Sequence, residues 1–363
     1  MATQFIESYL DAAWYVPTSS VRTISATTDK ARIDVALVCE NGVGNEMETF
    51  FETSLYAFNG VVELSDVGRL VEEYFRRRDK VADTIQITFD DVGMDILFLY
   101  SEHILPDDFD PDNTLFVASP VQRVHQDSTV VFAAVNRGSS VPCTIRAVGH
   151  NVGNDSLSVA EFSLRKPLSY DCATYFSVAE IIRIALGKTE TTLSVQLRDV
   201  LYFSIEYANI QKMCFIVNDP AYLTFSFRNV FNVEEFVDIV GTVTTKTEVS
   251  RDIAVCSGRS KHYDRVVSRS YQVETAPVPS DEVPVIEQLL ASHRVAMYID
   301  NNDYDVIIED HTCEPSSADD ALSTFKFSWH FDDQRPMDFD SNIYGIMTRH
   351  YRIFDDTFSL EYE

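Results

Sequence analysis

The stretch FSVAEIIRIAL, residues 176–186, has the pattern of a short amphipathic helix that begins after Ser177. Ser177 and Glu180 form the S-x-x-E pattern of a capping box, in which the serine side chain bonds the backbone at the start of a helix. The apolar residues recur at helical spacing and form one stripe: Val178, Ile181, Ile182, Ala185 and Leu186. A helix with a single apolar face packs on a sheet, so we expect Ile182→Asp to unfold the surrounding module.

Two other stretches repeat this pattern, LSDVGRLVEEYF at 64–75 and PSDEVPVIEQLL at 279–290. Ser65 and Ser280 are the predicted N-caps, and Pro284 falls in the first turn, where proline is tolerated. The predicted stripes are Val67, Leu70, Val71, Tyr74 and Phe75 in the first helix, and Val285, Ile286, Leu289 and Leu290 in the third. The three stretches therefore predict three copies of one helix.

Runs of β-forming residues around polar turns flank each predicted helix. Such pairs are typical of β-hairpins. The predicted hairpins that follow the helices join 84–89 to 96–100, 192–197 to 200–207, and 294–299 to 306–310, the last through DNNDYD at 300–305. The predicted hairpins that precede them lie in 31–58, 128–165 and 246–275, and the last has unusually long arms.

The sequence thus predicts a mainly β (α+β) fold of repeated antiparallel β-sandwich modules, each with one sheet-covering helix. Short polar breaks at 105–113 and 217–222 separate the copies. The predicted domains are 1–112 with helix 65–78, 113–218 with helix 177–187, 219–340 with hairpin 246–275 and helix 280–291, and an acidic tail at 341–363. The alternative is one large α+β fold whose helices resemble each other by chance.

The formal net charge of −28 argues against a general nucleic-acid binder, which needs a basic surface to release counterions from phosphate. Anionic membranes should repel the chain as well, and no apolar run approaches a membrane span of about 18 residues. The start of the chain lacks the basic region of a signal peptide. Six widely spaced cysteines (39, 143, 172, 214, 256 and 313) predict free, mostly buried thiols in a reducing compartment. We therefore expect synthesis in a cytoplasm.

Several motifs resemble functional sites but have simpler interpretations. LGKT at 186–189 lacks the first glycine of a phosphate-binding loop and is better explained as a helix end, with Gly187 in a left-handed conformation. Arg76, Arg77 and Arg78 suit the negative end of the first helix. The Asp-rich loop at 106–113 does not fit an EF-hand, although incidental calcium binding by Asp107, Asp108, Asp110 and Asp112 stays an open alternative.

Nothing in the sequence predicts a catalytic, cofactor-binding or metal-ligating residue. Adjacent carboxylates such as Asp90 and Asp91 point to opposite faces of a strand. His125, Asp127 and Ser128 are too close in sequence, on an expected strand, for a catalytic triad. We therefore predict that the protein is not an enzyme and uses no cofactor.

Segments 225–258, 262–295 and 306–333 resemble a family of structural proteins of tailed phages and prophages of gut Bacteroidota. The resemblance rests on FRNVFN at 227–232, the long hairpin, the third helix and the segment that ends in FKFSW at 325–329. Tail-tube, distal-tail and baseplate proteins of that kind have a small fold of two sheets, one helix and a long hairpin. The resemblance implies rings with acidic lumens.

The expected function is therefore a structural component of a phage tail or baseplate, located in the virion, which self-associates into a ring and contacts other tail proteins. This function implies neither specific nucleic-acid binding nor membrane insertion. One alternative is a carbohydrate-binding or adhesin protein, with Trp14 and Trp329 as aromatic platforms. A third is a carboxylate-dependent glycan hydrolase, with two acidic residues facing each other across a cleft.

Overall fold

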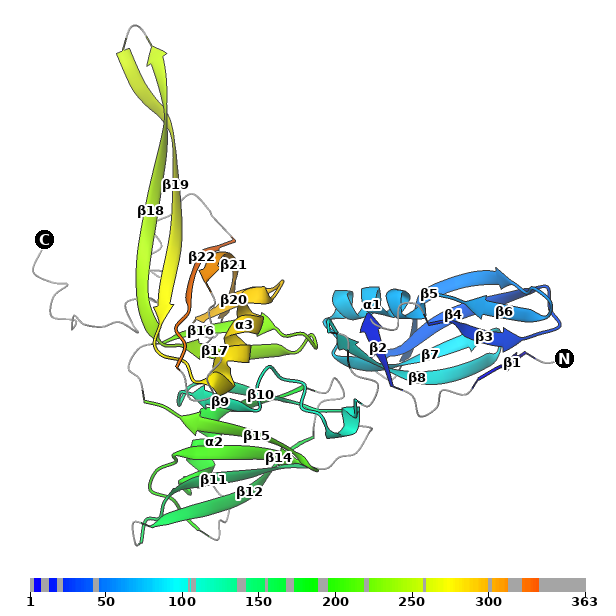
Figure 1. The fold of residues 1–363 in the computed structure, drawn as a ribbon, viewed down its shortest axis with the longest axis horizontal. Coiled ribbons are helices and arrows are strands. Elements are labelled where there is room, and N and C mark those ends of the chain that lie inside the picture. Colours follow the sequence, from blue (N-terminus) through cyan, green and yellow to red (C-terminus); the bar gives the residue numbers. More distant parts are fainter. Residues whose placement is uncertain are drawn as a thin grey trace, which may run out of the picture.

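A computed structural model describes residues 3–7, 13–17, 22–41, 46–103, 105, 109–135, 142–153, 156–167, 173–188, 195–218, 222–256, 259–299, 302–312 and 322–332. The chain is mainly β and forms three lobes, each with its own apolar core and one α-helix (Figure 1). We call them module 1 (residues 3–103), module 2 (109–218) and module 3 (222–332). The predicted acidic tail at 341–363 lies outside the described residues.

Module 1 has a five-stranded sheet and a three-stranded sheet that contribute to one core. The large sheet has the order β2-β8-β7-β4-β5, in which β2 runs parallel to β8, and the small sheet has the order β1-β3-β6. Its elements are β1 (Gln4–Phe5), β2 (Ala13–Pro17), β3 (Ile24–Thr27), β4 (Arg32–Asn41), β5 (Glu46–Tyr56), β6 (Val61–Leu64), α1 (Val67–Arg78), β7 (Ala82–Phe89) and β8 (Val92–Ser101).

Module 2 repeats this topology, except that its small sheet has no described counterpart of β1. Its large sheet has the order β12-β11-β14-β15-β9, again with the first strand in the chain parallel to the last, and β10 pairs with β13 as β3 pairs with β6. A short 3-10 helix, η1 (Pro111–Asn113), precedes β9 (Val121–Val124), β10 (Thr129–Ala133), β11 (Pro142–His150), β12 (Leu157–Pro167), β13 (Ala173–Ser177), α2 (Val178–Ala185), β14 (Tyr202–Tyr207) and β15 (Ile210–Ile216).

Module 3 keeps part of the plan in a seven-stranded sheet of order β17-β16-β20-β21-β22-β19-β18. Its hairpins β16–β17 and β20–β21 pair as β4–β5 and β7–β8 do in module 1. Its elements are β16 (Leu223–Arg228), β17 (Glu234–Ile239), β18 (Gly241–Cys256), β19 (Arg259–Thr275), η2 (Ser280–Glu282), α3 (Val283–Ala291), β20 (Val295–Ile299), β21 (Asn302–Thr312) and β22 (Lys326–Phe331).

Three predicted hairpins need correction. Residues 246–275 do form a long hairpin, β18–β19. In module 3, however, the hairpin that corresponds to β4–β5 of module 1 is β16–β17. The hairpin β18–β19 is therefore an addition to the repeated unit. In 128–165, β10 pairs with β13 in the small sheet, while β11 pairs with β12. The hairpin after α2 is β14–β15, whereas Leu197 makes only an isolated bridge to Asn151. Alternation marks strands, but it does not choose their partners.

The cap of α2 is as predicted, and the caps of the other two helices are not. Ser177 Oγ accepts the N–H of Glu180 at 3.4 Å, and Gly187 (φ 65°) ends the helix in the left-handed conformation. The N-cap of α1 is Asp66, not Ser65. Ser280 begins the 3-10 turn η2, so α3 starts later, with Glu282 as its N-cap.

The predicted apolar stripes are close to those observed. All four residues of the third stripe are buried, and in the first only Leu70 is not fully buried. In α2, Val178, Ile181 and Ala185 are buried as predicted, but Ile182 and Leu186 are half-buried and Ile184 takes the buried place. The stripe of α2 is thus rotated slightly from the one that the offsets predict.

This rotation makes a matched pair of variants informative. We expect Ile181→Asp to cost more than about 4 kcal/mol of unfolding free energy, because it places a charge in a fully buried site. Ile182→Asp should cost clearly less, because water reaches that side chain. Chemical denaturation of both variants checks the order, and equal losses would contradict the observed orientation of α2.

Candidate functional site at the junction of the modules

The FRNVFN loop, which joins β16 to β17, lies where the three modules meet. Asn229 is buried, and its Oδ1 accepts the N–H groups of Phe231 (2.9 Å) and Val233 (3.0 Å). Its Nδ2 donates to the carbonyl oxygen of Phe116 in module 2 at 3.1 Å. One asparagine thus closes the turn and also bonds it to the neighbouring module.

Asn232, at the other end of the loop, bonds to module 1. It has a φ of 61°, a left-handed conformation that asparagine tolerates better than most residues. Its Nδ2 donates to the carbonyl oxygen of Lys80 at 2.9 Å, just after helix α1. The carbonyl oxygen of Val230 also accepts the N–H of Glu102 at 2.8 Å. The loop is therefore bonded to both other modules.

An apolar cluster with members from all three modules surrounds these bonds. The ring centroids of Phe231 and Phe116 lie 5.1 Å apart, edge to face, and Phe109 continues the row toward Tyr15 of module 1. The buried members are Val81, Ala82, Leu99, Phe116, Val117, Val131, Ala133, Val135, Ala173 and Val233. Apolar burial is non-directional, so the hydrogen bonds of the loop determine how the modules are oriented relative to one another.

A charged clamp at the surface adds to the contact between modules 1 and 3. Asp79, the C-cap of α1, lies 2.9 Å from Nη1 of Arg294 and 3.5 Å from Nη2 of Arg228. The Asp79 side chain is 45% exposed and that of Arg294 is 56% exposed. Exposed ion pairs contribute little to stability, so the clamp mainly orients the two modules.

Modules 2 and 3 are joined by a buried ion pair. Lys212 on β15 is fully buried, and its Nζ donates to the carbonyl oxygen of Val131 at 3.0 Å. That Nζ lies 4.0 Å from Oε2 of Glu235 on β17, while Oε1 of Glu235 accepts the N–H of Ala118 (2.6 Å) and Nδ2 of Asn229 (2.7 Å). Burial raises the pKa of Glu235, although Lys212 and the two hydrogen bonds oppose the shift.

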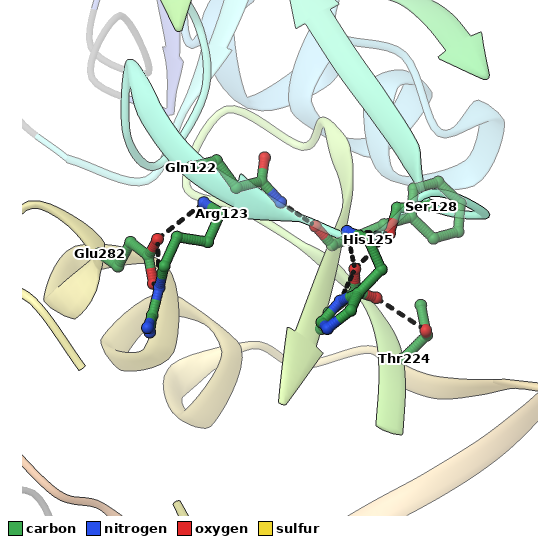
Figure 2. Close-up of polar contacts among 8 residues, drawn as sticks. Gln122, Arg123, His125, Ser128, Thr224 and Glu282 are labelled. Carbon is green, nitrogen blue, oxygen red and sulfur yellow. Dashed lines mark hydrogen bonds and ion pairs between the residues drawn. The ribbon is translucent and has the colours of Figure 1, made fainter. Parts of the chain in front are cut away.

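A second polar cluster lies nearby, between β9 and the sheet of module 3 (Figure 2). The carboxylate of Asp238 lies 3.1 Å from Nδ1 of His125 and accepts the hydroxyls of Ser128 and, at 2.8 Å, Thr224. The His125 ring stacks on Tyr222 with centroids 3.7 Å apart. His125 and Ser128 belong to module 2, and the other three residues belong to module 3.

This cluster contains serine, histidine and aspartate, but it is not arranged as a catalytic triad. In a triad the serine hydroxyl bonds the imidazole, which removes its proton. Here Ser128 donates to Asp238, and its Oγ also accepts the backbone N–H of His125 at 2.9 Å. The side chains of His125 and Asp238 are 5% and 4% exposed, and their bonds join module 2 to module 3. Asp127, the third residue of the sequence candidate, is not the carboxylate that joins them.

A hollow opens to solvent beside this cluster, between β9 of module 2 and α3 and β17 of module 3. Arg123 lies at its wall and binds Glu282 through Nε at 2.9 and 3.0 Å and through its backbone N–H at 2.7 Å (Figure 2). The remaining wall is mostly apolar. Its two acidic residues, Asp238 and Glu282, are both held by internal partners, unlike the two carboxylates of a glycosidase cleft.

The other sequence candidates lie outside this junction. Arg76 and Arg77 pair with Glu72 and Glu73 on the exposed side of α1, and Arg78 pairs with Glu48 at 2.5 Å. Asp110 caps η1 by accepting the N–H of Asp112 at 3.0 Å, while Asp107 and Asp108 are not among the described residues. Across the described part of the chain, no group of three or more His, Cys, Asp or Glu could hold a metal ion.

Both tryptophans contradict the expectation of aromatic sugar platforms. Trp14 is 1% exposed and Trp329 is 0% exposed. Trp14 packs edge to face on Phe98, and Trp329 stacks on Tyr271. Their rings belong to the cores of modules 1 and 3 and present no face to a ligand.

Three cysteines have described side chains, and all are free and buried, as predicted for them. They are Cys39, Cys143 and Cys214. Burial raises the pKa of Cys143 to about 11 and that of Cys214 to about 12, so both stay protonated and unreactive near neutral pH. None of the helices in the described ranges is long and apolar enough to cross a membrane.

Comparison with known proteins adds no family to this geometry. A scan against protein-family models and a search of curated proteins each found no match for this chain.

The buried pair between modules 2 and 3 predicts strong coupling in a double-mutant cycle. Lys212→Met and Glu235→Gln should each cost about 3–5 kcal/mol of unfolding free energy, because each leaves the other group buried without its partner. The double variant should cost much less than the sum. Denaturant titrations measure the four free energies. The exposed pair Glu73 and Arg77 is the matched control, with an expected coupling below about 1 kcal/mol. Additive losses at Lys212 and Glu235 would contradict the pairing.

The raised pKa of Glu235 predicts a pH dependence of definite sign. The folded protein binds the proton of Glu235 more tightly than the unfolded chain, whose carboxyl has the ordinary pKa of 4.5. Glu235 therefore contributes stability that is fully present below pH 4.5 and is lost as pH rises through the raised folded pKa. Thermal denaturation across this range, compared with Glu235→Gln, should show the native chain gaining stability relative to the variant on acidification. A constant difference would contradict the shift.

Proposed function

We propose that the chain is a structural component of a phage tail or baseplate that self-associates into a ring and contacts other tail proteins. On this proposal modules 1 and 2 are β-sandwiches similar to tail-tube folds, and module 3 is a variant whose strands form one sheet. Its function depends on the surfaces through which copies of the chain bind one another, and the junction of the modules sets the angles between those surfaces.

The observation that carries the proposal is the hairpin β18–β19, which projects far beyond the body of module 3 (Figure 1). Strand β22 pairs with β19 only over Tyr271–Glu274, so residues 246–256 and 259–270 form a two-stranded ribbon that no third described strand joins. Val249 and Ile253 on this ribbon are 46% and 60% exposed. A two-stranded ribbon is marginally stable alone in water, and a long open edge invites another strand. Both features favour a ribbon that is completed by a partner.

The junction supports the same proposal. Buried polar groups link modules 2 and 3, and a shared apolar cluster adds module 1. A ring subunit needs fixed angles between its contact surfaces, because errors in the angle accumulate around the ring. An enzyme would instead need exposed reactive groups in a cleft, and the polar groups of this junction bond one another.

Shortening the ribbon tests the proposal. Replacement of residues 247–269 by Asn-Gly should leave a tight turn between Lys246 and Ser270, which are paired in the native register. We expect the native chain to form concentration-dependent oligomers in sedimentation velocity and rings in negative-stain micrographs. The shortened chain should fold with the same thermal stability but stay monomeric.

Two outcomes would contradict the proposal. One is a native chain that stays monomeric at every concentration tested. The other is a shortened chain that assembles as the native one does.

A further inference from the structure

The projecting ribbon is basic, whereas the chain as a whole is strongly acidic. Residues 246–269 contain six Lys or Arg and three Asp or Glu, a net charge of +3 in a chain of net charge −28. On the outer strand β18, Arg251 is exposed between Val249 and Ile253, which are also exposed. On β18 itself Lys246 pairs with Glu248 at 2.6 Å and Arg251 is followed by Asp252, so the basic excess of the ribbon comes from β19. The ribbon as a whole presents apolar and basic groups beside an open strand edge, and its complement is an acidic strand edge.

Three large sheets offer few open edges for such a contact. The edge strand β17 of module 3 is covered by module 2, since Nε2 of Gln122 donates to the carbonyl oxygen of Phe236 at 2.7 Å. The edge strand β12 of module 2 contains Arg165, Lys166 and Pro167. Basic residues and proline discourage pairing with another strand, and here they would also repel a basic ribbon.

The corresponding edge strand of module 1, β5, has the complementary composition. Its sequence EMETFFETSLY contains three glutamates, of which Glu48 pairs with Arg78 of α1, and no lysine, arginine or proline. Along its outer face Glu52 is exposed, and the apolar side chains of Met47 and Tyr56 are 55% and 76% exposed. β5 pairs only with β4, so its other edge is free of described strands.

We propose that β18 of one copy pairs with β5 of a second copy, the basic ribbon lying along the acidic edge of module 1. This inference rests on the proposed function and names the surfaces that it uses. The ribbon and module 1 extend from the rest of the molecule in different directions and lie far apart (Figure 1), so a single chain does not make the contact within itself. Two different surfaces joined head to tail give a ring when the rotation closes and a filament when it does not.

Charge reversal with rescue tests this pairing in the full chain. The ribbon variant is Lys246→Glu with Arg251→Glu, the edge variant is Thr49→Lys with Glu52→Lys, and a combined variant carries all four changes. The control, Glu161→Lys with Ser163→Lys, makes the same charge change on the exposed face of β12. Circular dichroism and thermal denaturation first establish that each variant is folded.

Sedimentation velocity over a range of protein and salt concentrations then gives the association constants. The ribbon and edge variants should each weaken association at least about tenfold, because like charges then face each other. The combined variant should restore most of it, and the control should stay within about twofold of the native chain. Salt should weaken native association, since it screens exposed charges.

The outcomes separate this inference from the proposed function. A native chain that never associates overturns both. Assembly that survives the edge variant, or a combined variant no better than the single reversals, overturns only the pairing of β18 with β5. If the ribbon variant lost binding to a short DNA duplex while its assembly stayed unchanged, the ribbon would be a nucleic-acid-binding element. That result would also overturn the pairing of β18 with β5.

Discussion

The carboxylate of Glu235 is the group on which the arrangement of modules 2 and 3 depends. It is buried and accepts hydrogen bonds from Ala118 and Asn229, with the buried ammonium of Lys212 4.0 Å away. A buried ion pair adds little net stability, but removal of one partner leaves a charge that nothing compensates. The pair therefore destabilises every other packing of the two modules, because any shift that separates Lys212 from Glu235 leaves a buried charge without its partner. Asp238 repeats this constraint a few residues along β17.

Module 1 is attached by a different balance of forces. Its apolar residues Val81, Ala82 and Leu99 belong to the shared cluster, whereas its charged contact, Asp79 with two arginines, is partly exposed. Solvent and salt weaken such a pair. The loop from Asn229 to Asn232 takes part in both attachments, because Asn229 bonds module 2 and Asn232 bonds module 1. The angle of module 1 thus depends mainly on shape and on that loop, and that of module 2 on buried charge.

Much of the local structure was predictable from sequence, and most of the junction was not. Helix stripes and the serine cap of α2 depend on neighbouring residues, so spacing reveals them. Strand partners depend on the whole sheet, which is why the local sequence pattern predicts the wrong partner for β10. Lys212 and Glu235 lie in separate modules, and nothing near either residue marks it as buried. The one local signal was FRNVFN, whose two asparagines favour a turn, and Asn232 adopts the left-handed conformation there.

The third module shows how one change of topology produces a long open strand edge. In modules 1 and 2 a strand from the start of the unit, β2 or β9, ends the large sheet by running parallel to its neighbour. In module 3 that place is taken by β22 from the other end of the unit, antiparallel to β21, and its far side is free to accept β19. The inserted hairpin therefore continues the sheet and does not form a separate small one. Its outer strand β18 becomes an edge that extends away from the body, and the sheet of module 3 is left open on the side opposite its contact with module 2.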